Sequence, residues 1–235
     1  MKLGRVAVLL PLALLATAVF GIPAVLSGLL DRTGHWPREI AGAWGRTLLR
    51  LFGVKVVVRG SEHLPRGPAL YAANHGSALD IPIVFGHLPV DFRIIHKRSL
   101  YLSPIVGQFL YLGGHISVDR SSPFKAGKTL EQAAERMRGG TSVTVFPEGT
   151  RSREENLKPF KRGSFALAIQ AGVPVVPVSL GGVKPLVPQG LLSVLPGTVT
   201  LTIHPPVPTA GCGIEEAGRL AAEVRATVDA ACRAA

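Results

Sequence analysis

Residues 69–80 read Ala-Leu-Tyr-Ala-Ala-Asn-His-Gly-Ser-Ala-Leu-Asp. The first five are apolar or aromatic, and a short run of this kind predicts a buried β-strand. His75 and Asp80 follow directly after it. An imidazole titrates near neutral pH, and a carboxylate this close in sequence is within reach to orient it. The stretch therefore predicts a strand that ends at a base and an orienting acid.

Six further apolar runs, separated by glycine and proline, also predict strands: 54–59, 92–96, 115–118, 142–146, 175–180 and 198–204. Helical stretches are predicted between several of them, at 126–138 and 163–171, and a terminal amphipathic helix at 214–233. Apolar strands that alternate with helices predict an α/β fold with a largely parallel, twisted sheet covered by helices on both faces. The length of 235 residues suits one such domain plus an appendage.

The formal charge of +11 predicts an anionic partner, either an anionic lipid surface or a phosphorylated substrate. Nucleic acid is a weaker alternative, because aromatic residues are few and are not interleaved with the basic ones. The two cysteines, Cys212 and Cys232, have no metal-binding spacing and form no disulfide framework. A reducing cytosol fits this usage.

The N-terminal segment is strongly apolar. Residues 6–30 carry no charge, and Lys2 and Arg5 precede them. A cleaved signal peptide, a single spanning helix and a shallow or re-entrant insertion are all possible interpretations. Because Pro11 and Pro23 divide the run, we expect a broken helix that inserts shallowly.

Residues 37–52 combine helical spacing of apolar side chains with Trp44 and several arginines. This pattern is typical of a helix lying on a membrane, and an ordinary core-facing amphipathic helix is the alternative. We interpret 1–52 as membrane-anchoring helices and 53–235 as the main domain. Lys2 and Arg5 favour a cytoplasmic N-terminus, so we expect the domain at the cytoplasmic side of the cell (inner) membrane.

His75 has two possible roles. As a general base it would take a proton from a hydroxyl group while Asp80 holds its tautomer. Alternatively, Ser77 and Asp80 are spaced as a capping box at a helix start, which makes no use of the imidazole. A zinc site is less favoured, since no second histidine or cysteine lies at ligand spacing.

Polar residues also follow other predicted strands. Glu148 and Gly149 lie at the end of one strand, and Arg151 follows them as a candidate phosphate fork or, alternatively, a surface arginine in a turn. Arg120 follows another strand and has the same two readings, and Lys97 is a third candidate cation. In parallel sheets, ligands collect where strands end, so these residues are candidates for one site.

Two more stretches are distinctive in composition. The basic run 158–162 predicts a solvated face or a contact with lipid headgroups. From 163 to 213 the only charged side chain is Lys184, which indicates either core or an apolar binding wall. No Gly-x-Ser-x-Gly turn and no plausible reactive cysteine accompany His75, so direct attack by an acceptor hydroxyl is favoured over a covalent acyl-enzyme.

Four blocks occur in a fixed order along the chain: Asn74-His75-x-x-x-x-Asp80, Gly114-His115-Ile116-Ser117-Val118-Asp119-Arg120, Phe146-Pro147-Glu148-Gly149-Thr150-Arg151-Ser152 and Val173-Pro174-Val175-Val176-Pro177-Val178. In this order they resemble the glycerolipid acyltransferases, typified by lysophosphatidic acid acyltransferase (1-acylglycerol-3-phosphate O-acyltransferase), over roughly residues 54–205.

The resemblance implies that His75 and Asp80 form the catalytic pair. It also implies that the block beginning at Val173 lines the donor region and that two N-terminal helices anchor the protein to a membrane. The residues that we expect to bind the phosphorylated acceptor are Lys97, Arg120, Glu148, Gly149, Thr150 and Arg151.

The sequence thus predicts a membrane-bound acyltransferase. It would move a fatty acyl group from acyl-CoA or acyl carrier protein to the sn-2 hydroxyl of lysophosphatidic acid, giving phosphatidic acid. We expect no cofactor and no nucleic acid, with membrane lipids, the lysophospholipid and the acyl donor as partners. Two alternatives stay open: another acceptor (a different lysophospholipid, glycerol-3-phosphate or a lipid without phosphate), and a catalytically silent membrane-binding module.

Overall fold

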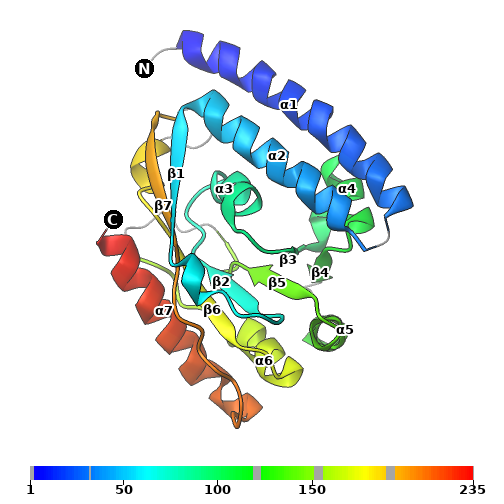
Figure 1. The fold of residues 1–235 in the computed structure, drawn as a ribbon, viewed down its shortest axis with the longest axis vertical. Helices are drawn as coiled ribbons and strands as arrows, with labels where there is room; N and C mark the ends of the chain where they lie inside the picture. Colours follow the sequence, from blue (N-terminus) through cyan, green and yellow to red (C-terminus); the bar gives the residue numbers. More distant parts are fainter. Residues whose placement is uncertain (1–2, 32, 119–122, 151–155, 189–193, 235) are drawn as a thin grey trace.

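The computed structural model describes residues 3–31, 33–118, 123–150, 156–188 and 194–234. Within them, seven strands form a sheet in the order β1-β7-β6-β2-β5-β3-β4 (Figure 1). The strands are β1 (Val54–Arg59), β2 (Leu70–Ala73), β3 (Phe92–Lys97), β4 (Ile116–Val118), β5 (Ser142–Val145), β6 (Val175–Gly181) and β7 (Gly197–Ile203). Each of these strands begins and ends within one residue of its predicted run, so the predicted strands are confirmed.

The sheet is largely parallel, as predicted. β2 pairs in parallel with both β5 and β6, and β3 pairs in parallel with β4 and β5. β7 is antiparallel to β6, and β1 is parallel to β7, so these two strands run opposite to the other five. Because β2, β5 and β3 are parallel neighbours, the residues that follow them meet at one edge of the sheet.

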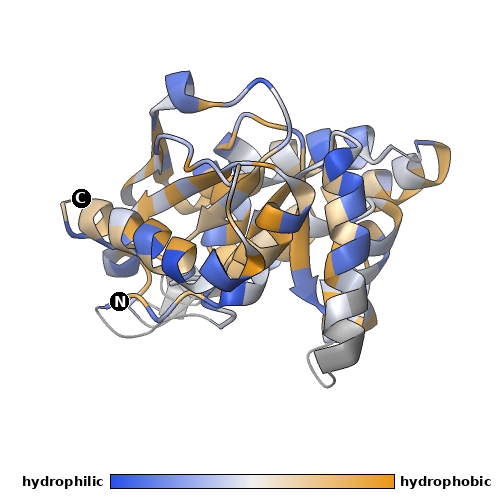
Figure 2. Cartoon of the chain, turned by 90° about the horizontal axis from the view of Figure 1, so that it is seen from below, coloured by the Kyte–Doolittle hydropathy of each residue, from blue (hydrophilic) through white to orange (hydrophobic). Residues whose placement is uncertain are grey.

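Helices cover both faces of the sheet, which confirms the predicted fold class. On one side lie α2 (His35–Phe52), α3 (Asp80–His87) and α4 (Val106–Leu112), and on the other lie α5 (Pro123–Arg138), α6 (Arg162–Ala171) and α7 (Ala217–Arg233). Short 3-10 turns are η1 (Ser61–His63), η2 (Arg98–Leu102), η3 (Lys184–Leu186) and η5 (Ile214–Glu216). Each helical layer packs its own hydrophobic core against the sheet, and Figure 2 shows the hydrophobic residues gathered on the strands between the layers.

Helix α1 (Leu3–Leu30) is continuous, with Pro11 and Pro23 inside it. The expectation that the prolines break the run is therefore wrong. A proline removes one backbone hydrogen bond, and the long apolar helix on either side tolerates that loss, as apolar membrane-type helices do. By length and composition, Ala7–Leu30 could cross a membrane. Most of the exposed large hydrophobic side chains that the structure describes lie on α1.

Helix α2 lies between α1 and the sheet domain (Figure 1). Leu48, Leu49 and Phe52 are buried in the core. Trp44 packs against that core and donates its indole N–H to the hydroxyl of Thr17 on α1, at 3.1 Å. The apolar side of α2 therefore packs as in the core-facing alternative, because α1 covers the side of α2 that would otherwise meet lipid. The membrane anchoring expected of 1–52 stays a prediction.

Candidate active site

His75 lies in the turn after β2, and Asp80 is the first residue of α3. Nδ1 of His75 and Oδ2 of Asp80 are 2.8 Å apart. Since the carboxylate can only accept, Nδ1 carries the proton and Nε2 keeps its lone pair. The side chain of His75 is 15% exposed and that of Asp80 is 1% exposed. The arrangement is a buried acid that orients an accessible base.

Only half of the capping box expected for Ser77 and Asp80 is formed, and the N-cap of α3 is Leu79, which has no side-chain cap. The backbone N–H of Ser77 donates to Asp80 Oδ2 at 2.8 Å, and the N–H of Leu79 donates to the Ser77 hydroxyl at 3.1 Å. The same carboxylate oxygen therefore holds both the imidazole and the turn that carries it. Because the turn is tied to the acid at two points, the imidazole has a fixed orientation before any substrate binds.

The ring of Phe146, directly after β5, stacks on the imidazole of His75. The ring centroids are 4.3 Å apart and the planes are inclined by 25°. β5 is the parallel neighbour of β2, which brings the two residues to the same edge of the sheet. Phe146 thus restricts the tilt of the imidazole from one side while Asp80 holds its Nδ1.

Glu148 is 3% exposed, and both of its carboxylate oxygens accept backbone hydrogen bonds. Oε1 accepts the N–H of His75 at 2.7 Å, and Oε2 accepts the N–H of Lys158 at 3.2 Å. Burial raises the pKa of the Glu148 carboxyl above its usual value, although the two N–H groups act in the opposite direction. This geometry makes Glu148 a positioning residue for the His75 turn. Its predicted contact with the acceptor stays a prediction.

Two further side chains support the turn from a distance. The Asn74 amide pairs with the backbone of Leu180 on β6, accepting its N–H at 2.7 Å and donating to its carbonyl at 3.2 Å. Arg225 of α7 donates to the carbonyls of Leu157 and Lys158, with its shortest bond at 2.7 Å. Arg225 therefore holds the segment that contains Lys158, and the N–H of Lys158 binds Glu148. Because Glu148 also binds the N–H of His75, α7 is linked to the His75 turn through these contacts.

The structure describes three of the other predicted site residues, which are Lys97, Gly149 and Thr150. Lys97, at the end of β3, is exposed and lines the same cavity as His75 and Gly149. Gly149 has a φ of 76°, a conformation that favours glycine, and lets the chain turn sharply after Glu148. The hydroxyl of the exposed Thr150 accepts a hydrogen bond from Lys158 Nζ at 3.3 Å. Arg120 and Arg151 lie outside the described residues.

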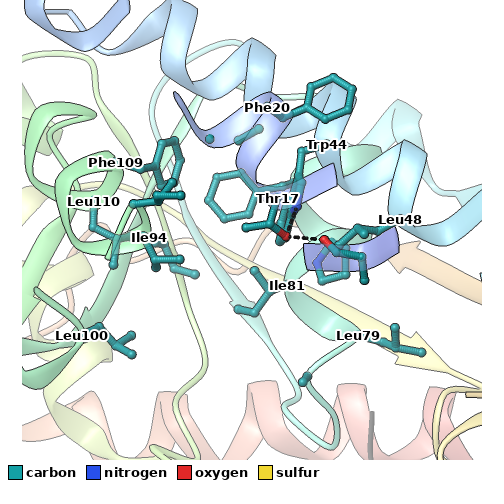
Figure 3. Close-up of a pocket in the computed structure, with 18 of the residues that line it drawn as sticks. Thr17, Phe20, Trp44, Leu48, Leu79, Ile81, Ile94, Leu100, Phe109 and Leu110 are labelled. Atoms are coloured by element: carbon teal, nitrogen blue, oxygen red, sulfur yellow. Dashed lines mark hydrogen bonds between the residues drawn. The ribbon is translucent and has the colours of Figure 1, made fainter. Parts of the chain in front are cut away.

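A largely apolar cavity of about 570 Å³ has His75 among its lining residues, and Figure 3 shows part of its apolar lining. The catalytic edge contributes His75, Phe146 and Gly149, while β3, η2 and α4 form a second wall. Further walls come from α3 with the turn before it and from α1 and α2, where the Thr17–Trp44 hydrogen bond supplies a polar contact between the two helices. The size and apolar lining of the cavity suit a long apolar chain.

Some contributions were not predicted from the sequence. Phe146 is the first residue of the third sequence block, but its stacking on His75 was not predicted, because an aromatic residue at a strand end is more typical of the core. Lys158 was predicted to belong to a solvated or lipid-facing run, which stays a prediction; the hydrogen bond from its backbone N–H to Glu148 was not anticipated. No sequence pattern indicated a role for Arg225, because it lies 68 and 67 residues away from Leu157 and Lys158, whose carbonyls it binds.

Comparison with known proteins agrees with this geometry. A family model described as Acyltransferase matches residues 55–181, which is more than half of the chain. The chain belongs to the acyltransferase family. The resemblance carried by the four sequence blocks is thereby confirmed.

Two relatives of this acyltransferase-family chain are both named as 1-acyl-sn-glycerol-3-phosphate acyltransferases. It is 42% identical over 157 residues to a 1-acyl-sn-glycerol-3-phosphate acyltransferase from Chlamydomonas reinhardtii, covering 66% of this chain and 47% of the relative. It is 34% identical over 177 residues to the human 1-acyl-sn-glycerol-3-phosphate acyltransferase alpha, covering 74% and 62% respectively. The chain thus spans about half the length of the curated relatives it matches.

A solved structure matches nearly the whole chain. The 1-acyl-sn-glycerophosphate (LPA) acyltransferase PlsC from Thermotoga maritima superimposes with a TM-score of 0.75 at 30% sequence identity, and the match covers 94% of both chains. The coverage includes the N-terminal helices as well as the sheet domain, so the acyltransferase-family fold extends over both.

Proposed function

We propose that the protein transfers a fatty acyl group from acyl-CoA or acyl carrier protein to the sn-2 hydroxyl of lysophosphatidic acid, giving phosphatidic acid. One observation carries the proposal: His75, whose Nδ1 is 2.8 Å from Oδ2 of Asp80, is among the residues that line a large apolar cavity. The relatives are named as acyltransferases of 1-acyl-sn-glycerol-3-phosphate, which supports the same acceptor. The proposed reaction needs no cofactor.

In the proposed mechanism, Nε2 of His75 takes the proton from the acceptor hydroxyl as its oxygen attacks the thioester carbonyl of the donor. The new C–O bond forms, the C–S bond breaks, and the proton passes from the imidazolium to the leaving thiolate. Asp80 stabilises the imidazolium between the two steps. Because Phe146, Glu148 and Asp80 already hold the imidazole turn, little reorganisation precedes the chemistry.

The acceptor phosphate is held, in this proposal, by cations at the same sheet edge. Lys97 is exposed and lines the cavity. Arg120 and Arg151 follow β4 and the Glu148 turn in the sequence, and a guanidinium matches phosphate oxygens in two-pronged fashion. A phosphate at this edge and an acyl chain in the cavity would place the free hydroxyl between them, beside Nε2.

The experiment that tests this function is a matrix of donors and acceptors with the purified full chain in detergent. Acyl-CoA and acyl carrier protein donors are each combined with lysophosphatidic acid, glycerol-3-phosphate, a zwitterionic lysophospholipid and monoacylglycerol. We expect phosphatidic acid from lysophosphatidic acid and far slower transfer to monoacylglycerol. Equal rates with the acceptor that lacks phosphate would contradict the proposed acceptor. Membrane attachment without turnover on any acceptor would favour the silent module.

We further propose that the protein is membrane-bound, with its catalytic domain on the cytoplasmic side of the cell membrane. Exposed apolar side chains on α1 support this, as do Lys2 and Arg5 before the apolar run. A second apolar region lies at η2 and α4, where Leu102 is 86% exposed and Tyr111 is 71% exposed. The α1 helix packs against α4, so both regions can meet one lipid surface.

Vesicle flotation tests the membrane proposal. Leu102→Glu should weaken binding by about tenfold or more, since one large apolar side chain loses its burial in lipid. Ile214→Glu is the matched control, because Ile214 is 53% exposed but lies on η5, beside α6 and α7. Equal effects of the two substitutions would contradict a membrane contact at η2.

A further inference from the structure

A second cleft, of about 330 Å³, lies along the side of α2 that faces away from the apolar cavity. The α2 residues that line the cavity are Ala41, Trp44, Leu48 and Phe52. The cleft is instead lined by the last turns of α2, the start of β1 and the end of α3, through Arg46, Leu49, Arg50, Gly53, Val54, Lys55, Val56 and His87. No acidic residue is among them.

Three cationic side chains and one imidazole therefore converge on a small space. Nη1 of Arg46 donates to the carbonyl of Gly86 at 3.1 Å, which holds its guanidinium beside His87. Burial lowers the pKa of His87, and the positive charges of Arg46 and Arg50 lower it further. Both arginines therefore lie close enough to His87 to act on it.

Nothing in the described part of the chain neutralises this charge. None of Arg46, Arg50 and Lys55 has a carboxylate within salt-bridge distance among the described residues. The C-terminus of α2 offers roughly half a negative charge, against three full positive charges. The cluster also has many N–H donors, of which one guanidinium bond is used, and like charges this close repel each other.

We propose that this cleft binds a phosphate group, held by Arg46, Arg50 and Lys55. Guanidinium groups match phosphate oxygens bidentately, and a lysine adds a point charge. The volume lies at the small end of ligand pockets, as expected for a single headgroup or small phosphorylated molecule. The site is separate from His75 and does not depend on the proposed acyl transfer.

The phosphate group can come from two sources. Leu9 and Ala13 of α1 line the cavity together with Leu48 and Phe52, so the end of α2 lies near the beginning of α1 (Figure 1). If α1 contacts a bilayer, a phospholipid headgroup can reach the cleft from the membrane surface. A soluble phosphorylated compound can reach it from the aqueous side. The chemistry that recognises the two is the same, and the experiment separates them.

The first arm titrates inorganic phosphate into the full chain in detergent micelles at constant ionic strength and follows the His87 imidazole by NMR. The signal is assigned by its loss in His87→Gln. We expect a saturable shift and a rise in the His87 pKa, because a bound anion stabilises the imidazolium. Arg50→Gln should weaken phosphate binding by about tenfold, since it removes a charge-assisted contact. Lys55→Gln is a second variant should the first not fold.

The control is Arg66→Gln, which removes the same charge from an exposed position outside the cleft. A shift that never saturates, or one weakened equally by Arg50→Gln and Arg66→Gln, would overturn the proposal. Since the readout involves no turnover, its failure is distinguishable from failure of the proposed enzyme activity.

The second arm measures flotation with vesicles that contain phosphatidic acid in phosphatidylcholine, for the same variants. Weaker flotation of Arg50→Gln than of Arg66→Gln, together with saturable phosphate binding, assigns the site to a lipid headgroup. Equal flotation of the two variants, with saturable phosphate binding that Arg50→Gln weakens, assigns it to a soluble phosphorylated compound. Both results support the site.

Discussion

Helix α2 separates two hollows of opposite chemistry, and each contains a histidine. On one side is a largely apolar cavity of about 570 Å³ with His75 at its edge, and on the other a basic cleft of about 330 Å³ with His87 in its wall. His75 has a carboxylate at 2.8 Å, whereas His87 faces Arg46 and Arg50. The same side chain thus lies beside a carboxylate in one place, where we propose that it accepts a hydroxyl proton, and beside cations in the other.

The difference shows that a histidine's role depends on its neighbours more than on its exposure. An imidazole beside a buried carboxylate keeps a fixed tautomer and gains stabilisation when it is protonated. An imidazole beside two guanidinium groups is held neutral unless an anion enters. The following predictions test this contrast, starting with the largest expected effect.

Replacing His75 should have the largest effect on turnover. His75→Gln removes the proposed base and should lower kcat by about 10²- to 10⁴-fold, the range of general-base contributions. Initial rates at saturating lysophosphatidic acid measure this. His35→Gln is the control, because His35 is an exposed histidine at the start of α2 and does not line the cavity. An equal loss of kcat in His87→Gln and His75→Gln would contradict the different roles proposed for the two histidines.

The carboxylate that distinguishes the cavity-side imidazole can be removed alone. Asp80→Asn should lower kcat by about 10²-fold or more, because an amide neither stabilises the imidazolium nor keeps Nδ1 protonated. The matched control is Asp229→Asn on α7, which loses an ion pair with Arg233. The measurement is kcat as a function of pH, and turnover close to that of the unmodified protein would remove Asp80 from the proposed mechanism.

A smaller effect is expected from the support behind the catalytic turn. Arg225→Gln frees the Leu157–Lys158 carbonyls and should lower kcat by roughly tenfold, with little change in KM, because a displaced base is misaligned in the transition state. Arg225→Lys should restore part of the rate. Arg219→Gln, on the same helix with only exposed ion pairs, is the control. Equal losses in both arginine variants would contradict the positioning role.

The smallest effect concerns His115, a buried histidine on the cavity side of the sheet. Burial is the main cause that lowers its pKa well below the usual value, and nearby Arg93 adds to it. The folded state thus binds this proton less readily than the unfolded state, so stability is complete above about pH 6.5 and falls as the pH decreases.

His115→Asn tests this sign. Its Oδ1 can still accept the N–H of Ile94, which His115 Nδ1 accepts at 3.0 Å. Below about pH 6.5, the unfolding free energy of the unmodified protein falls as the pH decreases. In the variant, this fall should be smaller by up to about 1.4 kcal/mol per pH unit. Chemical denaturation in detergent at several pH values measures it, with His35→Asn as control. An unchanged slope would show that His115 is not the group that titrates.

Most of the fold could be predicted because apolar periodicity is a local property. The strand runs around Leu70, Val143 and Val176 contain mainly apolar residues, since parallel strands buried on both faces require them. Continuity of α1 was not predicted, because a proline costs one hydrogen bond but does not determine whether the apolar turns on both sides remain helical. The position of α2 was not predicted either, since a membrane and a protein core select the same amphipathic pattern.

The candidate site was predicted where its residues are close in sequence. His75 and Asp80 are five positions apart, so their contact could be anticipated. Glu148 was found as a site residue, but its bonds to the backbone of His75 and Lys158 depend on β2 and β5 being parallel neighbours. Arg225 could not be found, because only the packing of α7 against the domain brings it to Leu157.

The sequence by itself determined the order of the strands along the chain and the short spacing of His75 and Asp80 after β2, and its positive charge predicts an anionic partner. These follow from local patterns, composition and short spacings. Only the tertiary structure decided which side of α2 meets the apolar cavity and which meets the basic cleft, and that Glu148 holds the catalytic turn. Such facts depend on contacts between segments far apart in the chain, and neither periodicity nor spacing encodes the direction in which a packed helix presents its sides.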